Sequence, residues 1–165
     1  MKNNISKTPL PSCEPVKSYL KNSPERKEAQ LLYEKYMRKT IDIPMFINGK
    51  NVKSKKMRNI APPHNHKHIV GKYYEGNSNH VKNAIGAALK AKKSWEETSW
   101  EDRASIFLKA AELLSGPYRQ KINVTTMIGQ SKNIFQAEID AACELIDFLK
   151  FNVAFMTNIY KIQPE

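Results

Sequence analysis

The sequence has few cysteines, few glycines and no long hydrophobic run. Its two cysteines, Cys13 and Cys143, lie far apart in the 165-residue chain, which excludes a disulfide-rich secreted scaffold and a cysteine-rich zinc module. No apolar stretch approaches the roughly 18 residues that a membrane-spanning helix needs, so we expect no integral membrane contact. The length suits one domain, or one domain with an N-terminal arm.

Positive charge exceeds negative charge, and the excess lies in the first half. The chain has 27 Lys and Arg against 16 Asp and Glu, a net charge of +11. Residues 1–75 hold 16 basic and 6 acidic residues, whereas residues 76–165 hold 11 and 10. The density is highest at Lys50, Lys53, Lys55, Lys56 and Arg58. Lysines that protect a solvated strand edge from aggregation explain this pattern. Nucleic-acid binding is the alternative. Because no recognition helix accompanies the basic residues, we predict no nucleic-acid partner.

The first 77 residues divide into an arm and a mixed segment. Residues 1–22 are polar and unpatterned, which predicts a mobile N-terminal arm. Ser23 can cap a helix that has Pro24 at its first position, with an apolar stripe that begins at Ala29, and Pro44 excludes its continuation. Residues 23–77 are therefore predicted to form this helix, followed by a β-hairpin and an extended segment.

The hairpin is predicted from its turn. Met45–Ile47 and Lys50–Val52 read as short strands joined by Asn48-Gly49, a dipeptide that accepts positive φ at both positions of a type I′ turn. A further extended segment runs from His68 to Tyr74. We see no clear partner strand for the hairpin.

Three histidines alternate at positions 64, 66 and 68. On a strand His64, His66 and His68 would share one face and could bind a metal. Pro63 instead favours a turn here, and no supporting carboxylate is near in sequence. We therefore predict no metal site.

Residues 78–165 read as nearly all helical. Apolar residues recur at spacings of three and four from Val81 onwards, which predicts a first helix. Ser99 can cap a second helix that ends at Gly116-Pro117. A third helix is predicted from about Tyr118 to Ile128, and the longest over about 133–160. These helices have more apolar face than they can cover among themselves. We expect them to lie against a sheet that residues 1–165 do not supply.

Glu138 breaks the pattern of the longest helix. On an ideal helix with about 100° per residue, Ala141, Leu145 and Met156 lie within about 60° of Glu138, whereas Asp140 and Asp147 lie opposite. An unpaired buried carboxylate is costly, so Glu138 should have a partner: a lysine, an arginine, backbone amides or a cationic ligand group. A first-turn acid satisfied by the helix dipole and water is the alternative.

Two other motifs are weak. Gly129-Gln130-Ser131-Lys132 lacks the second glycine and the residue order of a phosphate-binding loop. Cys143 falls toward the polar face of the same ideal helix, without a histidine nearby in sequence, so we do not expect it to be a nucleophile.

Three segments, SWEDRASIFLKAAELLSGPYR, TMIGQSKNIFQAEIDAACELIDFLKFNV and PHNHKHIVGKYY, resemble the N-terminal part of the glutamate γ-semialdehyde (pyrroline-5-carboxylate) dehydrogenases, which belong to the aldehyde dehydrogenase superfamily. The likeness extends from about residue 14 to the end. It implies an α/β aldehyde dehydrogenase-like fold, of which this chain would supply a mostly α part with about four to five helices, a short hairpin and extended strands. Residues 78–165 would be the incomplete N-terminal part of the NAD-binding domain.

The resemblance also implies a function. Members oxidise glutamate γ-semialdehyde to glutamate with NAD in proline degradation, as homo-oligomers acting on a small-molecule substrate. It places Glu138, in QAEID, near the ammonium end of the substrate, which makes Glu138 our one candidate substrate-binding residue. It implies the mitochondrial matrix, with the cytoplasm as the alternative.

The same resemblance places the catalytic cysteine, the base glutamate, the oxyanion asparagine and the NAD-binding segments downstream of residue 165. We therefore assign no catalytic or cofactor-binding residue and expect an N-terminal fragment, inactive by itself. The alternative is a truncated, non-catalytic interaction module that binds a partner subunit through exposed helix faces.

Overall fold

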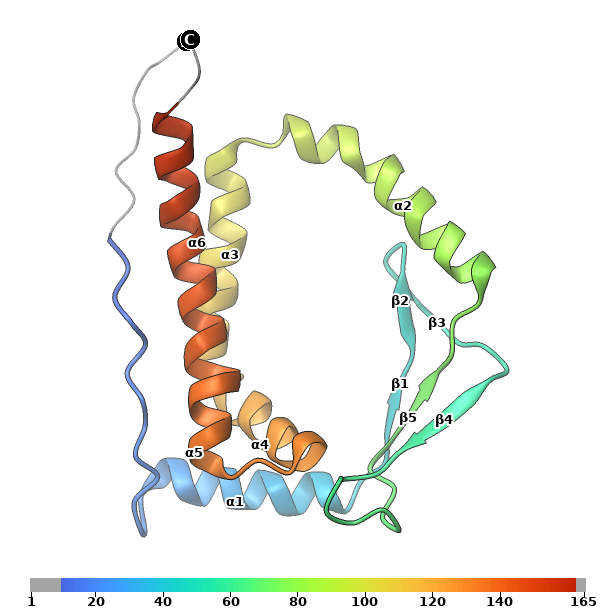
Figure 1. Cartoon of the computed structure of the whole chain (residues 1–165), viewed down its shortest axis with the longest axis vertical. Helices are drawn as coiled ribbons and strands as arrows, with labels where there is room; N and C mark the ends of the chain where they lie inside the picture. The colour runs from blue at the N-terminus through green and yellow to red at the C-terminus, as the bar shows by residue number, and fades with distance from the viewer. Residues whose placement is uncertain (1–9, 163–165) are drawn as a thin grey trace.

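The computed structural model describes residues 10–162, and it is mostly helical (Figure 1). The π-helix η1 continues α5 without a break and passes directly into α6, so the described residues form five helical rods, within the predicted range. The helices are α1 (Pro24–Met37), α2 (Ser78–Glu97), α3 (Trp100–Ser115), α4 (Arg119–Gln130), α5 (Ile134–Ala137), η1 (Glu138–Cys143) and α6 (Glu144–Lys161). No helix in this range combines the length and apolarity needed to cross a membrane.

The predicted start of α1 is confirmed. Ser23 is the N-cap, its hydroxyl accepts a hydrogen bond from the Arg26 amide at 3.3 Å, and Pro24 occupies the first turn. A proline fits there because the first amides of a helix have no intrahelical acceptor.

The strands form two small sheets, one of which was predicted. β2 (Met45–Ile47) and β3 (Lys50–Val52) pair in antiparallel fashion, and the turn residues Asn48 and Gly49 have φ of 51° and 73°, as a type I′ turn requires. The second sheet was not predicted as a sheet. In it, β5 (Gly71–Tyr74) lies between β1 (Ile41–Ile43), which is parallel to it, and β4 (Met57–Ile60), which is antiparallel.

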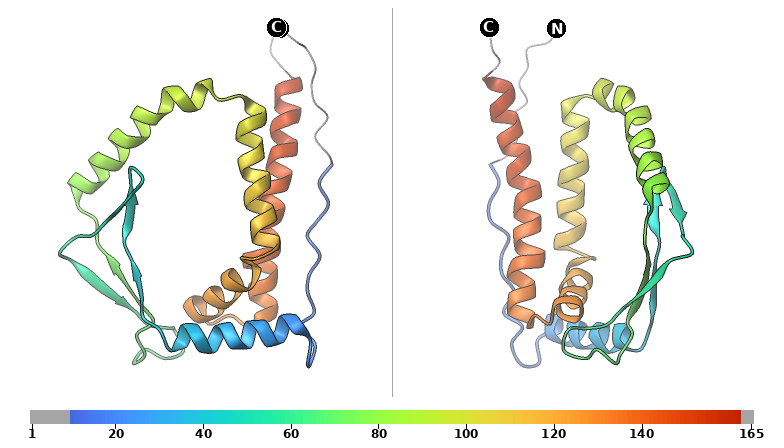
Figure 2. Two further views of the ribbon diagram at one scale, coloured as in Figure 1. Left: turned by 180° about the vertical axis from the view of Figure 1, so that it is seen from behind. Right: turned by 45° about the vertical axis from the view of Figure 1, so that its right-hand side comes forward.

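The elements are arranged in a ring (Figures 1 and 2). Helices α3 and α6 run antiparallel on one side, where the rings of Trp100 and Tyr160 stack with centroids 5.7 Å apart. The strands lie on the other side, α1 crosses the base and α2 spans the top. The described residues before α1, from residue 10 onwards, run beside α6 toward the base.

The core is divided into two clusters. One centres on Tyr19, Ala29, Val124 and Ile128 and joins α1 to α4. The other centres on Ala111, Ala142 and Ile146 and joins α3 to η1 and α6. Within the described chain α2 has no buried residue, and Val81, Ile85 and Leu89 are each more than half exposed. The amphipathic face predicted for α2 is therefore present and uncovered.

The N-terminal segment differs from the mobile arm that we predicted over residues 1–22. Residues 1–9 lie outside the described residues. From Glu14 to Tyr19 the chain forms neither helix nor strand, and it is held to the helices by hydrogen bonds and an ion pair. Tyr19 is only 3% exposed. These six residues are anchored because their polar groups supply partners to charges buried beneath them.

Candidate functional site

Glu138 lies at the start of η1 and is completely buried, with 0% of its surface exposed. The preceding turn is fixed by a reciprocal cap, in which the Asn133 side chain accepts from the Gln136 amide and the Gln136 side chain accepts from the Asn133 amide, both at 3.0 Å. This cap fixes where the helix begins. Because the Glu138 carboxylate is completely buried, it requires the partner that we predicted for it.

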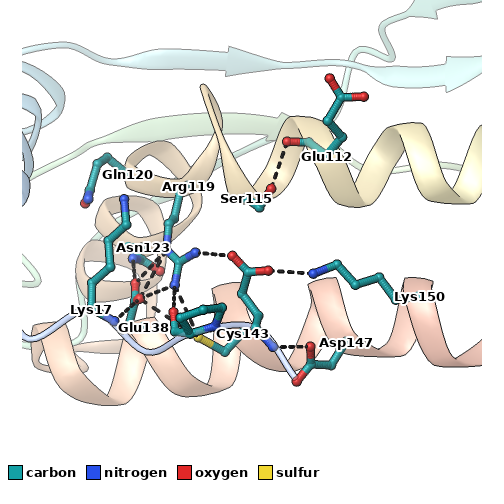
Figure 3. Close-up of polar contacts among 12 residues, drawn as sticks. Lys17, Glu112, Ser115, Arg119, Gln120, Asn123, Glu138, Cys143, Asp147 and Lys150 are labelled. Carbon is teal, nitrogen blue, oxygen red and sulfur yellow. Dashed lines mark hydrogen bonds and ion pairs between the residues drawn. The ribbon is translucent and has the colours of Figure 1, made fainter. Parts of the chain in front are cut away.

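That partner is an arginine (Figure 3). Arg119, at the start of α4, is 2% exposed. Its Nε donates to Oε1 and Oε2 of Glu138 at 3.1 and 3.3 Å, and its Nη2 also donates to Oε1. A guanidinium that approaches both oxygens in this way forms the strongest type of ion pair in proteins.

Three further donors complete the environment of the carboxylate. The Lys17 amide donates to Oε1 at 2.9 Å, and the Tyr19 hydroxyl and Asn123 Nδ2 donate to Oε2 at 2.8 and 2.6 Å. Burial raises the pKa of Glu138, but the hydrogen bonds from Arg119, Lys17, Tyr19 and Asn123 outweigh burial and leave its pKa below the usual value. Glu138 is therefore ionised at neutral pH.

Tyr19 has the opposite shift. Burial and its hydrogen bond to Glu138 raise its pKa to about 12. Its hydroxyl also accepts from Nε2 of Gln120 at 3.1 Å and Nδ2 of Asn123 at 2.9 Å. The backbone of Tyr19 has a φ of 49°, which is unfavourable for a residue with a large side chain. The buried hydroxyl contacts offset this strain.

A second acid extends the network to α6. Glu14 accepts from Arg119 Nη1 and from Lys150 Nζ, both at 2.6 Å, and its amide donates to Asp147 at 2.7 Å. Burial raises the pKa of Glu14, but Lys150 and Arg119 lower it below its usual value. The positive charges of Arg119 and Lys150 therefore balance the negative charges of Glu14 and Glu138 in this network.

Cys143 corrects one of our predictions. The ideal helix placed it toward the polar face, but it is 5% exposed, and its Sγ lies 3.4 Å from Arg119 Nη2. Burial, followed by the charge of Glu138, raises the pKa of its thiol. Because the thiolate is the nucleophilic form, this shift disfavours a reactive cysteine.

The π-helix explains why the ideal wheel failed beyond Glu138. We predicted Ala141, Leu145 and Met156 on the face of Glu138. The structure instead buries the residues that lie one position later in the sequence. A π-helix inserts one extra residue into a helix, which rotates all later residues by about 100°. The buried residues that follow Glu138 are Ala142, Cys143, Ile146, Val153 and Thr157.

One polar atom of the network has no partner. Among the described residues, Asn123 Oδ1 is the buried side-chain atom without a hydrogen bond. Its Nδ2 is held by the Glu138 carboxylate and the Tyr19 hydroxyl, which fixes the orientation of the amide.

The three histidines do not converge. Residues 63–68 contain turns, as Pro63 indicated. His64 Nδ1 bonds Ser131 Oγ at 2.7 Å, His68 Nε2 bonds the Met37 carbonyl at 2.6 Å, and His66 is exposed. Within residues 10–162 no group of three His, Cys, Asp or Glu is placed to hold a metal ion.

The basic residues at 50–58 lie on the exposed strands and their loops. Two of them are paired with acids: Lys53 with Asp42, and Arg58 with Glu75 at 2.5 Å. These exposed pairs contribute little stability each.

The network that holds Glu138 is suited to fixing a charge and not to proton transfer. The chain's own donors occupy both oxygens of Glu138. The pKa values of Glu14 and Glu138 are lowered and that of Tyr19 is raised, in each case away from neutrality.

Gly129 and Gln130 belong to the last turn of α4, so the weak phosphate-loop motif does not form a loop before a helix.

Arg119, Glu14 and Tyr19 were missed by sequence reasoning. One signal was available, because a basic residue in the first turn of a helix opposes the helix dipole. Arg119 is the first residue of α4, two positions after Pro117, and a cation at such a start indicates a specific acidic partner. Glu14 and Tyr19 carry no local signal.

Comparisons with known proteins agree with this architecture. The model of the aldehyde dehydrogenase family matches residues 49–164. A delta-1-pyrroline-5-carboxylate dehydrogenase of Agaricus bisporus is 44% identical over 159 residues, covering 96% of this chain and 29% of that protein. A mitochondrial delta-1-pyrroline-5-carboxylate dehydrogenase of Bos taurus is 43% identical over 151 residues, or 92% of this chain and 27% of that protein.

Solved structures give the same result. A crystal structure of the Delta-pyrroline-5-carboxylate dehydrogenase from Mycobacterium tuberculosis bound with NAD is similar with a TM-score of 0.95 at 40% identity. The likeness covers 99% of this chain and 31% of that one. The chain thus spans less than a third of the length of these relatives.

Proposed function

This chain belongs to the aldehyde dehydrogenase family, and from that premise we propose that it is part of an NAD-dependent enzyme that oxidises L-glutamate γ-semialdehyde (pyrroline-5-carboxylate) to L-glutamate. The observation that carries the proposal is the similarity to pyrroline-5-carboxylate dehydrogenases along nearly the whole chain, at 44% identity to one relative and a TM-score of 0.95 to another. The mostly helical fold with a short hairpin agrees with the fold class expected from the sequence.

The described residues support a structural contribution to this reaction. They contain no glycine-rich loop before a helix that would hold a dinucleotide, and their cysteines are an exposed Cys13 and a buried Cys143 whose raised pKa disfavours attack on an aldehyde. We therefore propose that NAD binding and chemistry lie outside residues 10–162. By itself the chain would be inactive.

Glu138 has two candidate roles. The resemblance favours a contact with the ammonium group of the substrate, and this stays a prediction. The hydrogen bonds to Arg119, Lys17 and Tyr19 support a second role, in which the ionised carboxylate fixes the N-terminal segment and the start of η1.

Substrate kinetics separate these roles in the complete protein. If Glu138 contacts the ammonium group, Glu138→Gln raises the KM for glutamate γ-semialdehyde more than the KM for propionaldehyde, which has no ammonium group. Equal changes for the two aldehydes would eliminate the contact and leave the structural role. Asp140→Asn, at an exposed acid of the same π-helix, is the matched control and should alter neither KM.

The reaction is tested with the protein translated from the full transcript. The purified protein should reduce NAD when glutamate γ-semialdehyde is added, measured as absorbance at the NADH band. Absence of NAD reduction in a folded protein that contains a downstream catalytic cysteine would overturn the proposal.

An interaction module is the second candidate, favoured by the uncovered apolar face of α2. The transcript beyond the codon for Glu165 distinguishes the two. A catalytic domain encoded there supports the enzyme, whereas a stop codon supports a module that binds a partner subunit.

Assembly and location are proposed on the same basis. Several relatives are named as mitochondrial, including those of Bos taurus and Dictyostelium discoideum. We propose a homo-oligomeric enzyme of the mitochondrial matrix that acts on a small molecule. Cell fractionation with an antibody to the chain tests the location, and a purely cytoplasmic signal would contradict it.

A further inference from the structure

A wide groove lies between α1 and the residues that connect α4 to α5. Its volume is about 1080 Å³, which is sufficient for a small organic ligand, since such sites measure about 300–1,000 Å³. Tyr19 is one of the residues that line it, and the hydroxyl of the same residue donates to Glu138. The groove is therefore adjacent to the buried network but distinct from it.

One part of the groove wall is apolar and exposed. Leu31 of α1 is 70% exposed and Phe135 of α5 is 52% exposed, and Met127 and Ile134 also line the groove. Exposed aliphatic and aromatic side chains gathered in one concave wall favour an apolar or planar ligand body.

Another part of the wall is positively charged. Three lining residues are basic, Arg26, Lys27 and Lys132, against one acid, Glu34. Lys132 is paired with Asp140 at 2.5 Å, and Glu34 is paired with Arg38 at 3.5 Å. Among residues 10–162, no acid lies within ion-pair distance of Arg26 or Lys27. These two cations are therefore available to an anion.

Fixed polar groups complete the site. His64 Nδ1 bonds Ser131 Oγ at 2.7 Å, and His64 Nε2 lies 3.4 Å from the Tyr33 hydroxyl. These side chains come from α1, from the loop after β4 and from the end of α4, and all three line the groove. A few oriented hydrogen-bonding groups in an otherwise apolar pocket are typical of sites that orient a small ligand.

We propose that this groove binds a small organic anion. Its apolar body would pack against the wall that includes Leu31 and Phe135, and its carboxylate, phosphate or sulfonate would pair with Arg26 and Lys27. Neither inorganic phosphate nor a neutral aromatic molecule combines both features. The site is independent of the reaction proposed above, because none of its cations contacts Glu138.

Binding is measured by calorimetry on the complete protein with three probes. These are 1-naphthoate, the uncharged 1-naphthalenemethanol and inorganic phosphate. We expect 1-naphthoate to bind at least about tenfold more tightly than either of the others, because each comparator lacks one half of the recognition. Addition of 1-naphthoate should also shift the NMR signals of the His64 ring.

Charge reversal supplies the matched control. Arg26→Glu with Lys27→Glu should weaken 1-naphthoate binding by about fivefold to tenfold, the effect of two partly exposed ion pairs. Lys90→Glu with Lys93→Glu makes the same change of charge on the exposed surface of α2 and should leave binding unchanged. Equal losses in the two double variants, equal binding of the uncharged probe, or no binding at about 1 mM probe would overturn the proposal.

Discussion

The buried pair of Arg119 and Glu138 is the interaction in which single side chains matter most. Arg119 is 2% and Glu138 0% exposed, and each has several hydrogen bonds. Such a pair need not be more stabilising than an apolar pair of similar size, but removal of one partner leaves the other charge buried without compensation. The pair therefore specifies one arrangement of α4, η1 and the N-terminal segment.

Glu138→Gln should destabilise the protein strongly. It keeps the shape of the side chain but removes its charge, and we expect the free energy of unfolding to fall by about 3–5 kcal/mol. Urea unfolding, followed by the fluorescence of Trp100 where it stacks on Tyr160, measures the change. Asp140→Asn removes an exposed ion pair of the same helix and should cost less than about 1 kcal/mol; similar losses in both variants would contradict the role of burial.

Acid should destabilise the protein through the same network. The pKa values of Glu14 and Glu138 are lowered from 4.5 in the folded state. Their contribution is therefore fully present above pH 4.5 and is lost as the pH falls below it toward the folded pKa values. Urea midpoints measured from pH 7 to pH 3 should fall in the wild type, and Glu138→Gln should show a shallower decrease; parallel curves would show that Glu138 does not contribute.

Secondary structure elements were predictable where a few neighbouring residues decide the conformation. Ser23-Pro24 and Asn48-Gly49 indicated the start of α1 and the hairpin turn, and the structure confirms both. The second sheet was missed because β1 pairs with β5 across a long intervening segment, which no local pattern reveals. Glu138 was identified by its position in an apolar stripe, but its partners Arg119 and Glu14 are distant in sequence.

Alanine substitutions of two glycines, one in the hairpin turn and one in α2, test the predicted turn. Gly49 has a φ of +73°, Gly86 lies within α2, and a Cβ at either position would meet no atom within 4 Å. Gly49→Ala should therefore destabilise the hairpin by about 1 kcal/mol through backbone strain alone, whereas Gly86→Ala should stabilise α2 by about 0.5–1 kcal/mol. Amide hydrogen exchange in β2, β3 and α2 measures both effects, and changes of the same sign would contradict this account.

Deletions test the register set by η1. Removal of the exposed Ile139 should convert η1 into ordinary α-helix and leave Ala142, Ile146 and Val153 on the face of Glu138, so the protein should remain folded. Removal of the exposed Asn152 within α6 rotates every later residue by about 100° and should turn Val153 and Thr157 away from the core. Circular dichroism and urea unfolding compare the two; unfolding by the first deletion alone would refute the register argument.

The elements within residues 10–162 leave much of their apolar surface uncovered. Its two buried clusters are small, and α2 contributes to neither. The sequence predicted such uncovered apolar faces, and that they lie against a further sheet stays a prediction. Because exposed apolar patches of this kind promote association, the isolated chain should self-associate.

Polar substitutions on α2 should reduce that association. Val81→Lys, Ile85→Glu and Leu89→Lys together should lower the mass measured by light scattering for the isolated chain. The free energy of unfolding should change by less than about 0.5 kcal/mol, as for surface substitutions. Ile146→Glu, at a residue that is 0% exposed, is the comparison and should unfold the chain. Unchanged association in the triple variant would show that another face is responsible.

The anchoring of residues 14–19 has a consequence for biosynthesis. The amide of Glu14 bonds Asp147, 133 residues later in the sequence. At a translation rate of about 5–20 residues per second, the ribosome releases Glu14 on the order of ten seconds before its acceptor exists. Tyr19 also waits, because its acceptor Glu138 is translated 119 residues later, so nascent residues 14–19 are open to a chaperone during that interval.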